Sequence, residues 1–169
     1  AAQIDLFWKH LEELATRPDN ISVRSTVLEN GKNLAVTFNH LHEQLANYQK
    51  DLDKQAQILV ERINGLSTQI ADLNKEIGKI KALGEEPNDL LDKREVLLQE
   101  LSGITNVTVQ KDNLSRYTIS IEGTILVTGD NSFNLSTATN AEGFAEVVFS
   151  SNNRPVKISD GKLKGLMEM

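Results

Sequence analysis

The chain of 169 residues contains no cysteine. This absence excludes disulfide bonds, cysteine nucleophiles and thiolate metal sites, and it is compatible with export from the cell. Long hydrophobic runs are missing as well, because no apolar stretch approaches the roughly 18 residues that a membrane span requires. We therefore predict that the chain does not insert into a membrane.

Positive charge is in the minority. The chain has 18 lysine and arginine residues against 24 aspartate and glutamate residues, which gives a net charge of -6. The basic residues are scattered among the acidic ones, so no basic stripe is present that could neutralise a phosphate backbone. We predict that nucleic acid is not a partner.

The residue patterns of catalytic and cofactor sites are also missing. A helical metal pair needs two histidines four residues apart, whereas His40 and His42 would point in nearly opposite directions and His10 is remote in sequence. Carboxylate pairs such as Asp51 and Asp53 lie in a helical segment without a pocket. No serine nucleophile elbow and no glycine-rich phosphate loop occurs. We predict no catalytic, cofactor-binding or metal residue, no cofactor and no small-molecule substrate.

What the chain does contain is a long apolar seam. Between residues 20 and 83, apolar residues recur at alternating steps of three and four, which predicts one very long amphipathic helix that packs against other helices. The middle of this seam has no obvious partner within the chain, because the neighbouring helical segments can cover only its two ends. We expect segments missing from this chain to cover it, although the seam could also pair with other chains. This middle seam consists of Phe38, Leu41, Leu45, Tyr48, Leu52, Ala56, Leu59, Ile63 and Leu66.

The remaining patterns predict an α+β fold. We expect helices over about 3–16, 20–83 and 88–102, with Gly84 and Pro87 ending the second one. Residues 104–162 alternate between apolar and polar and contain several turn clusters, which predicts a small antiparallel β-domain. The predicted organisation is therefore an elongated antiparallel helical bundle or coiled-coil rod over 1–103, the β-domain over 104–162, and the start of a helix returning to the rod over 163–169. A start at alanine and an incomplete last helix predict a fragment of a longer protein.

Three segments carry a resemblance to a known family. They are Ile63–Leu66 (INGL), Gln69–Ile77 (QIADLNKEI) and Pro87–Arg94 (PNDLLDKR). These segments resemble the bacterial flagellar hook-associated protein 1 family, in which a long helix is followed by a PNDLLD sequence with an arginine close behind. Residues 7–18 and 161–167 are similar to further helical segments of the family, so the resemblance spans the whole chain.

The resemblance implies a structural role without catalysis. Members of this family are exported through the flagellar secretion apparatus and form the extracellular junction between the hook and the filament. The implied partners are the hook protein, neighbouring copies, the adjoining hook-associated protein and, in the cell, an export chaperone that binds a C-terminal segment absent here. In the family a C-terminal helix returns to pack alongside the long N-terminal one, which would cover the middle seam.

Two other classes of protein remain open at this point. The chain could be another axial flagellar subunit, either flagellin-like or hook-associated. The apolar seam would also suit an intracellular coiled-coil scaffold, although such a scaffold explains neither the β-domain nor the segment from Pro87 to Arg94. Whether the protein lies outside the cell distinguishes the flagellar classes from the scaffold.

Overall fold

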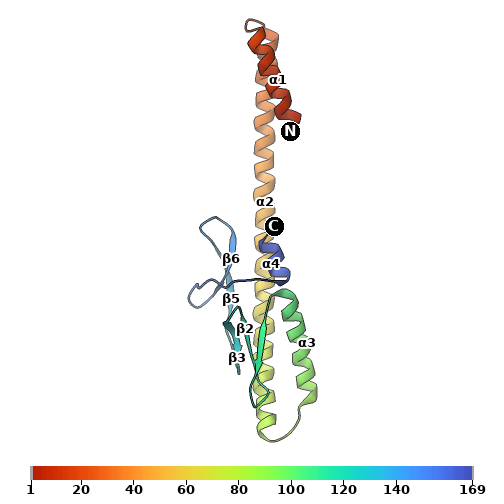
Figure 1. The fold of residues 1–169 in the computed structure, drawn as a ribbon, viewed down its shortest axis with the longest axis vertical. Coiled ribbons are helices and arrows are strands. Elements are labelled where there is room, and N and C mark those ends of the chain that lie inside the picture. Colours follow the sequence, from red (N-terminus) through yellow and green to blue (C-terminus); the bar gives the residue numbers. More distant parts are fainter. Residues whose placement is uncertain (1, 169) are drawn as a thin grey trace. The chain divides into compact units, whose positions relative to one another are not determined.

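The computed structural model describes residues 2–168, which form two compact units. The first unit, Ala1–Lys50, contains α1 (Ala2–Thr16) and the beginning of α2 (Ile21–Ala82). The second unit, Asp51–Met169, contains the rest of α2, then α3 (Asn88–Ile104), six strands and α4 (Gly161–Met167) (Figure 1). The long helix of 62 residues and the small antiparallel sheets confirm the predicted α+β fold.

The first unit is a hairpin of two helices. Its turn is closed by Asn20, whose side-chain oxygen accepts hydrogen bonds from the backbone N–H groups of Ser22 (3.0 Å) and Val23 (3.3 Å). These bonds satisfy donors that are left free at a helix start. A Cβ atom on Gly31 would lie 3.4 Å from the ring of Phe7, so α1 runs back along α2 with this ring against the glycine.

The boundary between α2 and α3 is close to the predicted one. Helix α2 ends at Ala82, and Gly84 follows with a φ angle of +81°, a conformation that favours glycine. Helix α3 runs two residues beyond the predicted end at residue 102, because Leu101 and Ile104 are both buried and continue its apolar face. It ends where the N–H of Thr105 donates to the carbonyl of Leu101.

The strands form two antiparallel sheets. The first sheet has the order β1-β2-β3-β4 and the second pairs β5 with β6. The strands are β1 (Thr108–Lys111), β2 (Tyr117–Ile121), β3 (Thr124–Thr128), β4 (Asn131–Ser132), β5 (Leu135–Thr139) and β6 (Ala145–Phe149). Glu122 and Gly123 connect β2 to β3 with positive φ angles at both residues, as a tight two-residue hairpin turn requires.

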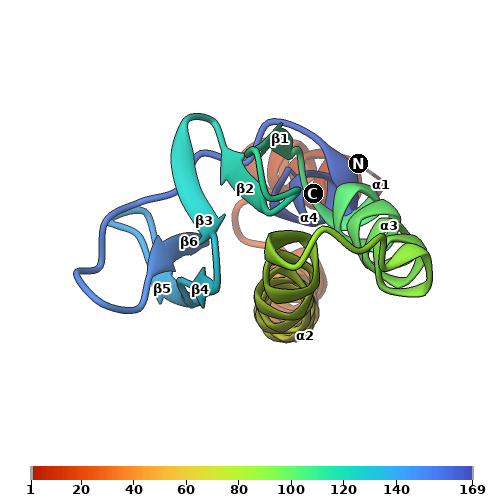
Figure 2. The ribbon, with the colours of Figure 1, turned by 90° about the horizontal axis from the view of Figure 1, so that it is seen from below.

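The core of the chain lies in the second unit. Seen along α2, helix α3 lies on one side of this part of the long helix and the strands lie on the other (Figure 2). Buried side chains of α2 share one apolar cluster with Leu101 of α3, Leu163 of α4 and residues of both sheets, including Ile119 and Val147. These three helices and both sheets therefore depend on the same hydrophobic contacts.

None of the helices within residues 2–168 combines the length and the apolar character that crossing a membrane requires. Helix α2 is long enough, but its polar and charged residues recur throughout its 62 positions.

Gly161 joins the start of α4 to the end of α3 through a close backbone contact. Its φ angle is +88°, and a Cβ atom at this position would lie 2.5 Å from the carbonyl oxygen of Ile104. Side chains with a Cβ atom rarely adopt this conformation. The neighbouring Asp160 accepts a hydrogen bond from the N–H of Gly161 (2.7 Å). A glycine is therefore required here, both by the positive φ angle and by the close approach of the Ile104 backbone.

We expect the substitution Gly161→Ala to lower the free energy of unfolding by about 2 kcal/mol or more, because the methyl group would clash with backbone atoms in a strained conformation. Urea unfolding followed by circular dichroism measures the change. The matched control is Gly165→Ala in the same helix, where an added Cβ meets no atom within 4 Å. Equal losses in the two variants would contradict this account of Gly161.

Candidate assembly surface

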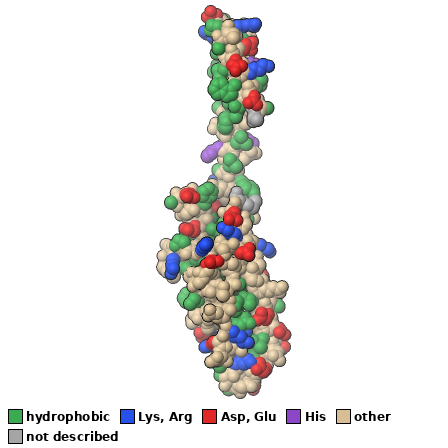
Figure 3. All heavy atoms as spheres, viewed as in Figure 1, with side chains coloured by type: hydrophobic (Ala, Val, Ile, Leu, Met, Phe, Trp, Pro, Cys, Tyr) green, Lys and Arg blue, Asp and Glu red, His purple; other side chains and the backbone are tan. Residues whose placement is uncertain are grey.

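The predicted middle seam is exposed where it belongs to the first unit. Phe38 is 53% exposed and Leu45 is 70% exposed, and Leu41 and Tyr48 are exposed to a similar degree. Figure 3 shows hydrophobic side chains at the surface of this unit, among charged ones. Since contiguous exposed apolar residues mark contact sites in soluble proteins, this part of the seam is a candidate surface for assembly.

The first unit lacks a core of its own. Of its described residues, only Val23 is a buried hydrophobic residue, and α1 contributes no buried side chain at all. A hairpin that removes so little apolar surface from water gains little stability from packing.

The prediction that segments outside the chain cover the whole middle seam is wrong for three of its residues. Ala56, Ile63 and Leu66 are buried in the core of the second unit, together with Leu101 and Leu163. The reason is that α3 and α4 pack on this part of α2, a tertiary contact that the heptad spacing alone does not indicate. The two remaining residues of the seam in this unit, Leu52 and Leu59, are half-buried.

A buried asparagine fixes the first sheet to the long helix. The side chain of Asn74 is fully buried, and its amide nitrogen donates to the carbonyls of Tyr117 (2.8 Å) and Gly129 (2.7 Å). Its oxygen accepts from the N–H of Tyr117 (2.9 Å) and from Nη1 of Arg94 (2.9 Å). The amide therefore makes four hydrogen bonds, which is all that it can make.

Arg94 joins α3 to the same place. It is buried, and its Nη1 also donates to the carbonyl of Ser115 (2.6 Å), while its guanidinium carbon lies 3.5 Å from the centre of the Tyr117 ring. Burial lowers the pKa of Arg94, whereas Tyr117 and the nearby carboxylates of Glu95 and Asp112 favour the charged form. Burial and a hydrogen bond to Glu95 raise the pKa of Tyr117, so its hydroxyl stays protonated and donates to that carboxylate.

A second asparagine on α2 holds the second sheet. Asn64 donates to the carbonyl of Leu135 (2.8 Å) and accepts from its N–H (2.8 Å), so its amide replaces the backbone of a neighbouring strand. We refer to the Asn64 and Asn74 contacts as the asparagine joints. These contacts were not predicted from the sequence, although both residues lie in segments that carry the family resemblance. The available signal was a polar residue beside the apolar seam.

The site patterns that the sequence analysis considered stay apart in the structure. His40 and His42 are exposed, while His10 is half-buried and lies 3.8 Å from the carboxylate of Glu13. Over residues 2–168 no three histidine or carboxylate side chains are grouped so that they could hold a metal ion. The arrangement is therefore one of packing surfaces and polar joints.

We expect Asn74→Ala to lower the free energy of unfolding by about 3 kcal/mol, because it leaves four polar groups without their partner in a buried site. Urea unfolding followed by fluorescence and circular dichroism would measure the loss. Asn47→Ala, an exposed position on the same helix, is the control and should change stability by less than about 0.5 kcal/mol. A small effect of Asn74→Ala would show that the joint is not required for docking of the sheet.

Comparisons with known proteins agree with the resemblance seen in the sequence. The chain matches the family model described as "Flagellar hook-associated protein FlgK helical domain" over residues 1–169. It is 33% identical over 125 residues to flagellar hook-associated protein 1 of Bacillus subtilis (strain 168), which covers 73% of this chain and 25% of that protein. It is 30% identical over 143 residues to the protein of the same name from Escherichia coli (strain K12), which covers 80% of this chain and 25% of that protein.

The fold is similar to a solved structure of the same kind. The flagellar hook junction protein FlgK from Burkholderia pseudomallei superimposes with a TM-score of 0.86 and 25% sequence identity, over 98% of this chain and 32% of that one. The chain thus spans about a quarter of the length of the curated relatives that it matches. Because the family model matches the chain from its first to its last residue, the chain belongs to the family of flagellar hook-associated protein FlgK helical domains.

Proposed function

We propose that this chain is the helical domain of a structural subunit that joins the hook of the bacterial flagellum to its filament. The observation that carries the proposal is the family match over residues 1–169, supported by the similar fold of a hook junction protein. The subunit acts through packing and performs no catalysis. It is exported through the flagellar secretion apparatus and works outside the cell.

The exposed part of the middle seam is the surface through which the rest of the polypeptide completes this domain. About three quarters of the length of the relatives lies outside the matched region, so ample chain is available to supply a further helix. Covering Phe38, Leu41, Leu45 and Tyr48 would stabilise the domain by about 1.5 to 3 kcal/mol for each fully buried side chain. We propose that α4 belongs to a helix that returns along the helical region, which is the role expected for residues 163–169.

The asparagine joints support a mechanical role. They tie both sheets to α2 by hydrogen bonds to strand backbone, in addition to the shared apolar core. A helical region over 1–103 and a β-domain over 104–162 joined in this way would resist separation under the torque of a rotating flagellum. The partners in this proposal are the hook protein, neighbouring copies, the adjoining hook-associated protein and an export chaperone.

The proposed function predicts that loss of the gene leaves the source bacterium with hooks that carry no filaments, because the connecting subunit is missing. Electron microscopy of the cells measures this, and gold-labelled antibodies against the chain should mark the boundary between hook and filament in the complemented strain. Filaments of normal number on the deletion strain would overturn the proposal.

The proposed role of the seam makes a second prediction. In the complete polypeptide, Leu45→Glu should lower the free energy of unfolding by about 3 kcal/mol, because a carboxylate would then be buried against the covering helix. In the isolated 169-residue chain the same substitution should alter the free energy of unfolding by less than about 0.5 kcal/mol, since Leu45 is 70% exposed there. Gln44→Glu, the neighbouring exposed position, is the control for the added charge. Equal effects in the long and short proteins would show that nothing covers the seam.

A further inference from the structure

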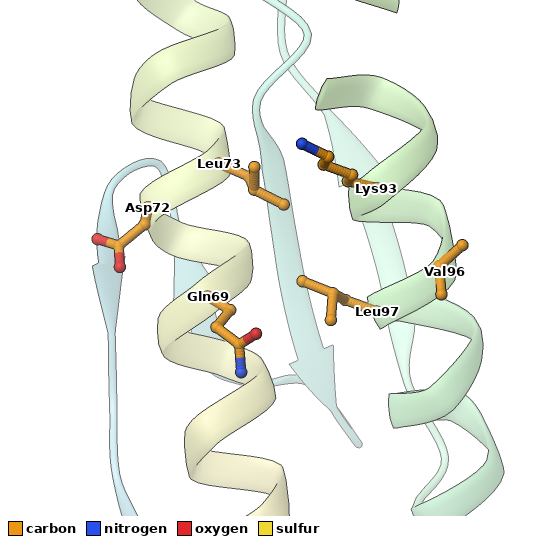
Figure 4. A pocket seen from close by; sticks show the side chains of 6 residues that line it. All are labelled: Gln69, Asp72, Leu73, Lys93, Val96 and Leu97. Atoms are coloured by element: carbon orange, nitrogen blue, oxygen red, sulfur yellow. The ribbon is translucent and has the colours of Figure 1, made fainter. Parts of the chain in front are cut away.

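Two apolar hollows repeat along one face of α2 in the second unit. The first, of about 500 Å³, lies between α2 and α3 and is lined by Gln69, Asp72, Leu73, Lys93, Val96 and Leu97. The second, of about 540 Å³, lies between α2 and α4 and is lined by Gln55, Ile58, Leu59, Lys162, Gly165 and Leu166. In Figure 4, Leu73 and Leu97 point toward each other across the first hollow.

The hollows are in register with the heptad repeat. The residues that α2 contributes to the second hollow precede those of the first by 14 positions in each case, so Ile58 corresponds to Asp72 and Leu59 to Leu73. Two heptads place residues on the same side of a helix, about 21 Å apart at 1.5 Å per residue. The two hollows therefore lie on one side of α2, with the ion pair of Arg62 and Glu100 (2.6 Å) between them, and we call them together the double hollow.

Two glycines at the double hollow have open space where a side chain would lie. Gly65 lies midway between Ile58 and Asp72, seven residues from each, and Gly165 lines the second hollow; an added Cβ would meet nothing within 4 Å at either position. Glycine weakens the interior of a helix, so its presence needs another reason. A backbone that approaches closely from outside supplies one. Val96 and Ile58, which are 65% and 62% exposed, add apolar surface for it to bury.

The charges around the double hollow are opposite in sign to the charge of the whole molecule. Two lysines, Lys93 and Lys162, and one aspartate, Asp72, line it, and the charges of Arg62 and Glu100 between the hollows cancel in their ion pair. The local excess is therefore positive, whereas the chain carries a net charge of -6. A surface of opposite sign to the rest of a molecule attracts a second copy in a head-to-tail contact.

Helix α1 has the properties that the double hollow requires. Its 15 residues span about 22 Å, which matches two heptads. It has no buried side chain and carries three acidic residues against one lysine. Its outward side shows Trp8, which is 61% exposed, with Ala15 one heptad further along and flanked by Asp5 and Glu12.

We propose that α1 of one copy docks into the double hollow of a second copy, with Trp8 as its aromatic anchor and with Asp5 and Glu12 facing the lysines. Tryptophan is enriched among the residues that contribute most of the binding energy in protein interfaces, where it fills a pocket from which water is excluded. The contact joins different surfaces of the two copies, so it can extend from copy to copy. This inference rests on the proposed function, because it needs an assembly in which copies lie side by side.

Residues 1–169 contain no cysteine, so thiol cross-linking gives a direct test once any cysteine elsewhere in the complete protein has been replaced by serine. Two variants of the complete protein, Glu12→Cys and Lys93→Cys, are produced together in the bacterium, and isolated flagella are treated with a short bis-maleimide. We expect a cross-linked dimer at least tenfold above that from cells producing either variant alone. The pair Glu12→Cys and Lys157→Cys is the control, since Lys157 is exposed but does not line either hollow.

The outcomes separate this inference from the proposed function. Flagella that contain both proteins at the hook boundary but yield no dimer above the control overturn the docking and leave the junction role intact. Cross-links from Lys93→Cys to a cysteine introduced in another helix of the same polypeptide also overturn it, because the double hollow is then filled from within.

A charge exchange provides a second test that needs no cross-linker. Copies with Lys93→Glu and Lys162→Glu should fail to support filament attachment alone, as should copies with Asp5→Lys and Glu12→Lys. Cells producing both sets should regain filaments, because each acidic surface then meets a basic one. Failure of the mixed cells, with both proteins exported in normal amounts, would contradict the docking.

Discussion

Backbone groups at the edge of a strand need hydrogen-bond partners. A helix cannot supply these partners from its own backbone, because its N–H and C=O groups already bond one another within the helix. In the second unit of this chain, asparagine side chains on α2 meet that need. Asn64 bonds both backbone groups of Leu135, and Asn74 does the same for Tyr117. The two sheets can therefore lie directly against a helix while the backbone groups of Leu135 and Tyr117 keep hydrogen-bond partners.

Arg94 extends this polar contact to the third helix. Its guanidinium bonds Asn74 and Ser115 and lies over the Tyr117 ring, so α2, α3 and the first sheet meet at one buried positive charge. Removing one member of such a network leaves the others without partners, which makes the arrangement specific to one packing.

The distribution of burial connects the fold to assembly. The apolar cluster of the second unit includes both sheets and three helices, whereas the first unit buries one hydrophobic residue among those described. A domain with a complete core in one unit and exposed apolar helices in the other suits a subunit whose exposed apolar residues are covered by other segments on assembly. The seam of α2 and the outward side of α1 are the two surfaces where this can happen.

The heptad spacing, the glycine and proline signals and the alternation after residue 104 determined the helices, their approximate ends and the antiparallel strands, because these features depend on local contacts along the chain. The tertiary structure alone decided which seam residues are buried: Ile63 and Leu66 lie beneath α3 and α4, while Phe38 and Leu45 remain exposed. It also decided that Asn64, Asn74 and Arg94 act as joints. Their partners are 20 to 71 residues away in the sequence, and no local pattern encodes contacts over such separations.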